Sequence, residues 1–266
     1  MRVPLSPGTE RGVTLKSPAE LETIRVAGRH VAEILFELSE AIKPGVTTLA
    51  IDRMVQEAVH KRKLKSPFLG YQPNKNTPPY PASICTSVND EVVHGIPSAK
   101  VILKDGDIIG LDFAAIHEGY IADAAVTLPV GKVSKAIQRM LAIGRQALLE
   151  GILAAVPPNR VNDIGHAVQR YAEKHGMSVV RDYMGHGVGT TMHEAPSVPN
   201  FGQPGTGIKL QPGMVIAIEP MLNQGVKETR VGSDGWTVRT NDGQLSVHFE
   251  HTIAITDRGP EIITKL

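Results

Sequence analysis

Two aspartates, Asp112 and Asp123, lie within apolar, strand-like segments at residues 108–115 and 120–130. A turn at residues 117–119 separates these segments, and this pattern predicts a β-hairpin. The midpoint between the aspartates falls inside the turn, so we expect them to pair directly, with Cβ atoms ~5 Å apart on one face. A buried carboxylate without a partner is very costly. The pair therefore indicates a cation, a shared proton or nearby arginines, with an exposed acidic edge as the alternative.

Two glutamates have similar surroundings. Glu219 follows the apolar run 214–218, and Glu250 lies inside the apolar segment 247–255. An acid within an inner strand is uncommon without a partner. Salt bridges would explain each acid separately, whereas one shared metal site would explain all of these carboxylates together.

Histidines complete the set of candidate ligands. His186 lies between glycines in YMGHGVG (183–189), where a ligand can approach the backbone closely. His193 lies between Met192 and Glu194, and His94 lies in VHGIP (93–97). A lone histidine beside a glycine is usually structural, so the prediction depends on the whole group.

The ligand set is too large for one small cation and suits two divalent ions, whose charge balances the carboxylates. Two such ions ~3.5–4 Å apart activate water at neutral pH and stabilise a developing oxyanion. A covalent nucleophile has no support, because Cys85 has no recognisable partner and no G-x-S-x-G motif is present. No phosphate-binding or dinucleotide-binding glycine motif appears either. The sequence therefore predicts a two-metal hydrolase.

The elements that position these residues are helices followed by strands. Helical spacing predicts helices over residues 18–42, 48–63, 134–155 and 162–175, with Ser17, Thr48, Ser134 and Asn162 as caps. Strands are expected at 214–222, 236–240 and 245–255, and loops at 73–81 and 202–213.

A weak internal repeat relates the two halves of the chain. Aligning Pro44 with Pro157 also aligns residues 55–56 with 168–169, and Gly28 matches Gly144 at a slightly different offset. We interpret this as two similar halves forming one domain at residues 17–266, after a flexible tail at 1–16. Chance similarity is the alternative. A repeat of this kind would place the site at the crease between the halves.

Composition excludes several classes of protein. The 266 residues carry 28 Lys plus Arg and 27 Asp plus Glu, a balance that argues against DNA binding. The single cysteine excludes an intrachain disulfide and indicates a reducing compartment. No signal peptide or membrane span is evident, so we expect a cytoplasmic monomer without membrane contact.

An ordered set of motifs carries a resemblance over nearly the whole chain. It comprises VNDEVVHGIP (88–97), DGDIIGLDF (105–113), the spacing of Asp112 and Asp123, YMGHGVG, Met192-His193-Glu194, AIEPM (217–221), DGWTV (234–238) and FEHT (249–252). Each motif alone is weak, but their order and spacing are specific. The chain resembles type I methionine aminopeptidases of the bacterial kind. The resemblance implies the α+β pita-bread fold, with two pseudo-symmetric halves around a curved antiparallel sheet.

The resemblance also implies the roles of individual residues. The implied metal ligands are Asp112, Asp123, His186, Glu219 and Glu250. Asp123 and Glu250 would bridge the two ions, and Glu219 would also act as the general base. His94 and His193 would hydrogen-bond the substrate backbone. The substrate's amine would bind near the ion held by Asp112.

The resemblance implies a pocket for the methionine side chain as well. The matching positions are Phe68, Tyr71, Tyr80, Cys85, Met192 and Trp236, although core packing is the alternative for any one of them. The substrates would be nascent polypeptide N-termini with a small second residue. Oxygen ligands with one imidazole admit Mn, Fe, Co, Zn or Ni.

Three features depart from the family pattern. The loop between Tyr71 and Tyr80 is longer than in short bacterial members, Ala114 stands where many members have Thr, and His248 replaces a common Gln. Other pita-bread enzymes, such as Xaa-Pro aminopeptidases, and a non-enzymatic ribosome-associated binding protein are the alternatives. The basic run 60–65 is either a solvated helix end or a contact with ribosomal RNA. The P-x-x-P string at residues 4–7 is a weak docking motif.

Overall fold

The computed structural model describes residues 12–265. Its helices are α1 (Pro18–Ala41), α2 (Thr48–Lys61), α3 (Lys135–Ala154) and α4 (Val161–Lys174). The string at residues 4–7 lies outside the described residues. Of the predicted tail, residues 12–16 are described, and this short stretch is packed: Val13 bridges Ala195, and the Lys16 amide donates to the carbonyl of Gly213.

Local capping signals explain where the helices begin. Ser17 forms the predicted capping box with Glu20, and Ser134 caps α3 as predicted. The other two caps were wrong by one or two residues. Thr47, not Thr48, caps α2 by accepting a hydrogen bond from the Ala50 amide.

The cap of α4 differs because Asp163, the third residue of the helix, binds the backbone amide of Arg160. Arg160 occupies the N-cap position, and its amide donates to the Asp163 carboxylate at 2.7 Å. Asn162 lies inside the helix, and its side-chain amide donates to the Thr206 hydroxyl.

A curved antiparallel sheet forms the centre of the molecule, with strand order β1-β3-β4-β13-β8-β6-β7 and with β14 paired to β13. Smaller sheets follow the orders β10-β11-β2 and β12-β9-β5. The strands of the central sheet are β1 (Cys85–Val88), β3 (Ile108–His117), β4 (Tyr120–Pro129), β6 (Gly185–Gly187), β7 (Glu194–Val198), β8 (Val215–Ile218), β13 (Glu250–Thr256) and β14 (Gly259–Ile262). The smaller sheets contain β2 (Glu91–Val93), β5 (Ser178–Val179), β9 (Met221–Asn223), β10 (Thr229–Val231), β11 (Val238–Thr240) and β12 (Ser246–His248).

The predicted late strands are shorter and more interrupted than expected. The segment 214–222 divides into β8 and β9 at Glu219 and Pro220, because proline cannot donate to a sheet ladder. The segment 245–255 divides into β12 and β13 at Phe249, and the strand predicted from 236 begins at Val238. The loops predicted at 73–81 and 202–213 are confirmed as irregular.

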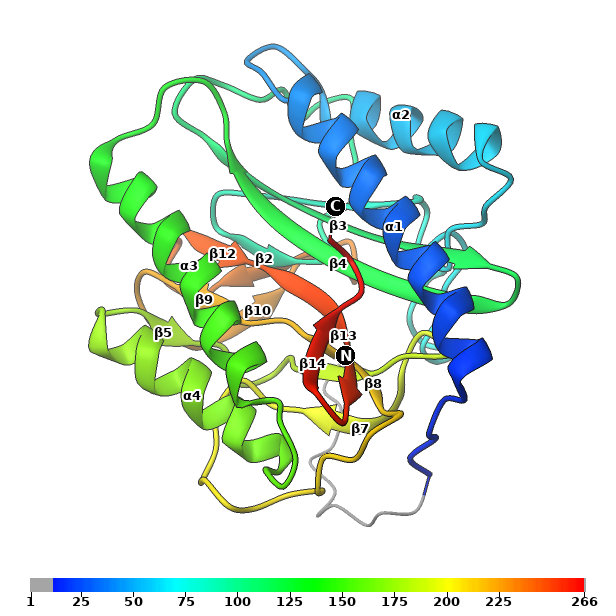
Figure 1. Cartoon of the computed structure of the whole chain (residues 1–266). Helices are drawn as coiled ribbons and strands as arrows, with labels where there is room; N and C mark the ends of the chain where they lie inside the picture. The colour runs from blue at the N-terminus through cyan, green and yellow to red at the C-terminus, as the bar shows by residue number, and fades with distance from the viewer. Residues whose placement is uncertain (1–11, 266) are drawn as a thin grey trace.

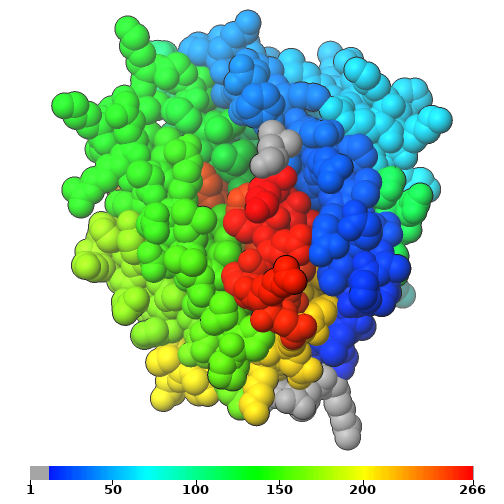
Figure 2. Space-filling view, viewed as in Figure 1, coloured from blue at the N-terminus to red at the C-terminus, as the bar shows by residue number. Residues whose placement is uncertain are grey.

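Each half of the fold has one long helix, one short helix and strands of the central sheet (Figure 1). α1 packs on β3 and β4, and α3 packs on α4 and on β12, β13 and β8. Separate apolar cores form under the two helix pairs. The red C-terminal segment reaches the surface between α1 and α3 (Figure 2). This arrangement is the pita-bread fold implied by the motifs, and it places a site at the junction of the halves.

Candidate metal centre and substrate cavity

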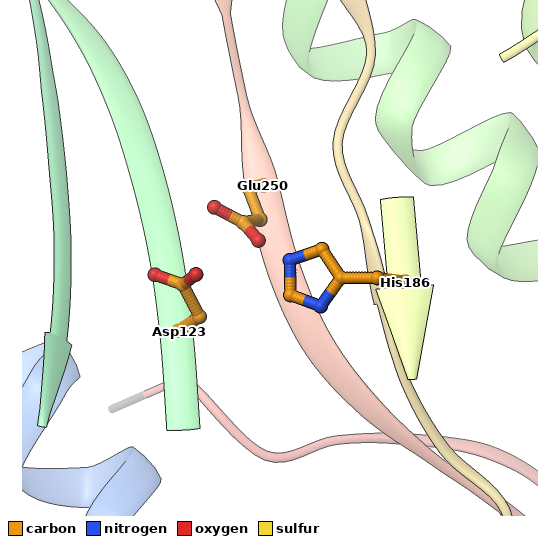
Figure 3. A group of neighbouring side chains, drawn as sticks. All are labelled: Asp123, His186 and Glu250. Atoms are coloured by element: carbon orange, nitrogen blue, oxygen red, sulfur yellow. The ribbon is translucent and has the colours of Figure 1, made fainter. Parts of the chain in front are cut away.

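Three side chains from neighbouring parts of the central sheet converge on one point (Figure 3). Asp123 lies on β4, His186 on β6 and Glu250 on β13. One ligand atom from each lies within 4.8 Å of the others, and all three residues are buried. A carboxylate pair with one imidazole at this separation is a donor set that a divalent cation can occupy.

Glu219 and Asp112 extend this cluster on either side. Glu219 Oε1 lies 3.6 Å from His186 Nε2. Asp112 lies beside Asp123, whose charge is one of the causes that raise the pKa of Asp112. All of the predicted metal ligands therefore lie together, while their individual coordination roles remain predictions.

The register of the β3–β4 hairpin corrects the opening expectation. Asp112 pairs with Ala125 and Asp123 pairs with Ala114, so the aspartates are diagonal neighbours and not a direct pair. The turn consists of Glu118 and Gly119 alone, with φ of 47° and 86°. Both aspartates still face the same side, because the pairing error of two residues preserves side-chain alternation.

The electrostatics of the cluster favour a bound cation. Burial, together with the charges of Asp123 and Glu219, raises the pKa of Asp112 well above its usual range. Burial raises the pKa of Asp123 to about 7 and, with neighbouring charges, strongly raises the pKa values of Glu219 and Glu250. Without cations, burial and mutual repulsion therefore favour the protonated forms of these carboxyls.

Unpartnered oxygen atoms provide a second test of the fit to metal. Asp112 Oδ1, Asp123 Oδ1 and Glu250 Oε1 are buried and accept no hydrogen bond from the described residues. Such orphaned acceptors are rare in native proteins unless an ion or water satisfies them. Burial also lowers the pKa of His186 to about 4, so its imidazole is neutral and able to bind metal. The residues present therefore fit divalent cations.

Two further histidines, His94 and His193, line the cavity that also contains the acidic cluster. Burial lowers the pKa values of His94 and His193 to about 3, so both are neutral at physiological pH. Tyr71 Oη lies 2.9 Å from His193 Nδ1. His94 has a φ of +60°, a strained conformation that concentrates at functional sites. Its ring lies edge-on to Trp236, with centroids 6.0 Å apart.

One cavity of about 1000 Å³ joins the acidic cluster to an apolar wall. Every predicted site residue lines it, including the pocket positions Phe68, Tyr71, Tyr80, Cys85, Met192 and Trp236. Tyr80 packs edge-on against Trp236, at 5.1 Å between centroids. Burial raises the pKa of the Cys85 thiol well above its usual range, so this side chain is a neutral part of the wall.

The loop at residues 72–79 forms one rim of this cavity. Pro73, Asn74 and Thr77 line the cavity. The Trp236 indole N–H donates to the Pro78 carbonyl at 2.8 Å, which ties the loop to the aromatic wall. The loop therefore borders the pocket, as the sequence predicted. Tyr80 lines the pocket, and its hydroxyl donates a hydrogen bond to the Gly95 carbonyl.

The two other departures from the family pattern also lie at the site. Ala114 is fully buried opposite Asp123. His248 Nε2 lies 3.5 Å from Glu219 Oε2, and burial lowers its pKa to about 3. Thr127 holds the His248 backbone by hydrogen bonds to both its amide and its carbonyl.

Sequence reasoning missed two residues beside His193. Glu194 lines the cavity, and Lys16 forms an ion pair with it at 2.6 Å. The two residues are 178 positions apart, so no local pattern could have joined them.

A buried carboxylate–imidazole centre on a pita-bread fold defines a metal-dependent hydrolase. The family model described as "Metallopeptidase family M24" matches residues 22–257. The chain belongs to this family.

Relatives extend the match over nearly the whole chain. The methionine aminopeptidase of Clostridium acetobutylicum is 46% identical over 252 residues, covering 95% of this chain and 98% of that protein. The crystal structure of methionine aminopeptidase from Thermotoga maritima has a TM-score of 0.92 at 41% identity and covers 96% of this chain and 100% of that one. The resemblance drawn from the motifs is therefore confirmed.

A more distant structure shares the fold alone. Prolidase from Pyrococcus furiosus has a TM-score of 0.72 at 21% identity, and the match covers 95% of this chain but 65% of that one.

Within the described residues, no helix is both long and apolar enough to cross a membrane.

Proposed function

We propose that this chain is a two-metal methionine aminopeptidase, which removes the initiator methionine from proteins and peptides with a small second residue. One observation carries the proposal: the acidic cluster and the apolar, aromatic pocket line a single cavity. A hydrolytic centre next to a pocket for an unbranched apolar side chain suits cleavage after methionine. The activity named for the relatives supports the same conclusion.

The metal ligands would be Asp112, Asp123, His186, Glu219 and Glu250, with Asp123 and Glu250 bridging. The orphaned oxygens of Asp112, Asp123 and Glu250 support this assignment, as do the raised pKa values of the four carboxyls and the neutral imidazole of His186. Bound divalent ions (Mn, Fe, Co, Zn or Ni) would lower the pKa of a coordinated water and stabilise developing negative charge. Glu219 is the proposed general base, because its neighbour His248 is neutral and leaves the carboxylate free to accept a proton.

His193 is suited to donate a hydrogen bond to the substrate. If the Tyr71 hydroxyl donates to His193 Nδ1, the neutral ring carries its proton on Nε2. His94 is neutral as well, and its strained backbone fixes its ring against Trp236. The two histidines would bind the peptide backbone and stabilise the tetrahedral intermediate without adding charge to the site.

The methionine side chain would lie against Phe68, Tyr80, Cys85, Met192 and Trp236. Aromatic rings and the thioether of Met192 make favourable contacts with the sulfur of a bound methionine. The substrate's amine would bind near Asp112, which limits cleavage to the first residue. An Xaa-Pro aminopeptidase is not favoured, because the X-Pro aminopeptidase structure from Thermotoga maritima is only 19% identical, whereas the methionine aminopeptidase of Clostridium acetobutylicum is 46% identical. A binding protein without activity is not favoured, because every predicted ligand is present.

The cellular setting is also proposed. Its substrates are nascent polypeptide N-termini, and the protein acts in the cytoplasm as a monomer. In the basic run at residues 60–65, Arg62 pairs with Glu33 and Glu37, whereas Lys61, Lys63 and Lys65 are exposed and free to contact ribosomal RNA.

A peptide panel tests the proposed function. The purified full-length chain, stripped of metal and reloaded with each candidate ion, is assayed on Met-Ala-Ser, Met-Arg-Ser and Leu-Ala-Ser. We expect release of methionine from Met-Ala-Ser at least ~100-fold faster than release from the other two peptides, and no turnover without metal. Equal rates for Met-Ala-Ser and Met-Arg-Ser would contradict the substrate assignment. Undiminished turnover after chelation would contradict the metal mechanism.

A further inference from the structure

The segment at residues 13–16 lies beside the loop that carries His193. Val13 forms a parallel bridge with Ala195, the residue that follows Glu194. Thr14 Oγ1 donates to Glu194 Oε2 at 2.8 Å. Lys16 Nζ donates to the same oxygen at 2.6 Å and also contacts Thr14 Oγ1. The N-terminal segment therefore converges on one carboxylate oxygen.

The other oxygen of Glu194 holds the loop itself. Glu194 Oε1 accepts hydrogen bonds from the amides of Thr190 and Thr191, at 2.8 and 3.2 Å. Residues 189–193 belong to no helix or strand, and Thr190 and Thr191 are exposed. The loop carries Met192 and His193 into the substrate cavity. Glu194 thus connects this irregular loop to the N-terminal segment.

Close packing shows that the connection is built into the fold. A Cβ atom at Gly189 would lie 2.4 Å from Glu194 Oε1 and 2.5 Å from Lys16 Nζ, so a side chain there would displace the ends of both side chains and disturb the ion pair. The Gly189 carbonyl accepts a hydrogen bond from the Ile121 amide on β4, two residues from Asp123. The ion pair, the loop and a ligand-bearing strand therefore meet at Gly189.

The pair is shielded from solvent. The exposed fractions of the Lys16 and Glu194 side chains are 6% and 12%. Burial acts to raise the pKa of Glu194, but the hydrogen bonds from Lys16, Thr14 and Thr191 outweigh it, and the pKa is lowered. Glu194 is consequently charged and fully bonded at neutral pH, which makes it a stiff support.

We propose that Lys16 is a positioning residue for catalysis, which fixes His193 at the substrate through the Glu194 carboxylate and the 190–193 loop. This inference rests on the proposed function, in which His193 bonds the substrate backbone. The Tyr71 hydroxyl positions the His193 ring from one side, and the Glu194 support positions its backbone from the other. A displacement of a catalytic group by ~1 Å can lower a rate by ~100-fold.

A double-mutant cycle on the full-length, metal-loaded chain tests the proposal. Lys16→Met, Lys16→Arg and Gly189→Ala are measured with His193 present and in the His193→Ala background. We expect Lys16→Met and Gly189→Ala to lower kcat/KM on Met-Ala-Ser by ~10-fold to ~100-fold when His193 is present, and by less than ~3-fold when it is absent. Lys16→Arg keeps the positive charge and should retain most of the wild-type kcat/KM.

Arg25→Met is the matched control. It removes another ion pair, between Arg25 of α1 and Glu261, and neither of these residues lines the cavity. It should leave kcat/KM within ~2-fold of the wild type. An equal loss in both His193 backgrounds, or an unchanged kcat/KM in Lys16→Met, would overturn the positioning role. Should Lys16→Met not fold, Gly189→Ala decides the same question without removing a charge.

Hydrogen–deuterium exchange provides a measurement that needs no turnover. The amides of Thr190 and Thr191 should exchange at least ~10-fold faster in Lys16→Met and Gly189→Ala than in the wild type or in Arg25→Met. Unchanged exchange would contradict the proposed support. An inactive wild type would contradict the proposed function alone, because exchange at these two amides would still test the connection.

Discussion

At the residue scale, the case for a metal centre depends on buried carboxylate oxygens that accept no hydrogen bond from the described residues. Asp112 and Asp123 are diagonal neighbours across the β3–β4 hairpin, with Ala125 and Ala114 as their direct partners. Diagonal positions lie ~7–8 Å apart, closer between Cβ atoms, which leaves more space between the carboxyls for an ion than a direct pair does. The corrected register therefore strengthens the case for a cation between these strands.

Removing the proposed general base tests the same cluster. Glu219→Gln keeps the shape of the side chain but removes its charge and its ability to take a proton. We expect kcat/KM on Met-Ala-Ser to fall by between ~100-fold and ~10,000-fold, which is the usual range for the loss of a positioned base. Calorimetry should also show weaker binding of at least one metal ion.

The matched control for Glu219→Gln is Glu261→Gln. It makes the same chemical change on β14, at a carboxylate that pairs with Arg25 of α1. Its activity should stay within ~2-fold of the wild type. If Glu219→Gln retained full activity in metal-saturated enzyme, Glu219 would be neither base nor essential ligand.

The candidate metal ligands could be predicted because Asp112, His186, Glu219 and Glu250 lie in recognisable motifs and Asp123 lies at a specific spacing from Asp112. The Lys16–Glu194 pair could not be predicted, because its members are 178 positions apart in sequence, although Glu194 lies in the motif Met192-His193-Glu194. The hairpin register was also missed, because a two-residue turn with Glu118 at positive φ is hard to distinguish from a three-residue turn.

At the element scale, glycines bring both long helices close to the sheet. A Cβ atom at Gly28 on α1 would lie 2.5 Å from Ile263 Cγ2, and one at Gly144 on α3 would lie 2.6 Å from Phe249 Cε2. The sequence repeat that matched these two glycines thus has a packing reason. The caps Ser17 and Ser134 were predictable because capping is local, whereas short strands such as β5 and β6 are defined by partners distant in sequence.

Gly144→Ala tests this packing. In an ordinary helix the change would stabilise by ~1 kcal/mol. Here the added methyl group would displace Phe249, which is 3% exposed, so we expect the free energy of unfolding to fall by ~1–3 kcal/mol in urea titrations.

The double variant Gly144→Ala with Phe249→Leu is the control, because the smaller side chain relieves the overlap. Its loss should be smaller than the sum of the two single losses. A stabilised Gly144→Ala would mean that α3 moves away from the sheet at little cost.

At the scale of the whole molecule, the two halves close around a cavity whose walls come from both. Asp112 and Asp123 belong to the first half, and His186, Glu219 and Glu250 to the second. The fold could be predicted from the sequence because its motifs occur in a specific order along the chain. The depth and width of the cavity could not, because they depend on how the loops at 72–79 and 189–193 pack against the sheet.

This shared site links metal binding to the stability of the whole fold. In metal-free protein, the four site carboxyls have raised pKa values, that of Asp123 being about 7. From pH ~4 upwards, until each carboxyl passes its raised pKa, the folded state therefore binds more protons at these groups than the unfolded state. Their contribution to stability is therefore lost as pH rises. The histidines act oppositely, since His94, His186, His193 and His248 have lowered pKa values and favour folding as pH rises towards ~6.5.

The two effects offset each other below pH ~6.5, and only the carboxyls remain above it. We expect the free energy of unfolding of chelator-treated protein to fall by at least ~1 kcal/mol between pH 6.5 and 8, as urea titrations would measure. With saturating Mn²⁺ the trend should reverse, because ligands must lose protons to bind metal and affinity therefore rises with pH. A metal-free protein whose stability rises over this interval would show that the carboxyls are already charged, and that the cluster is compensated by something other than cations.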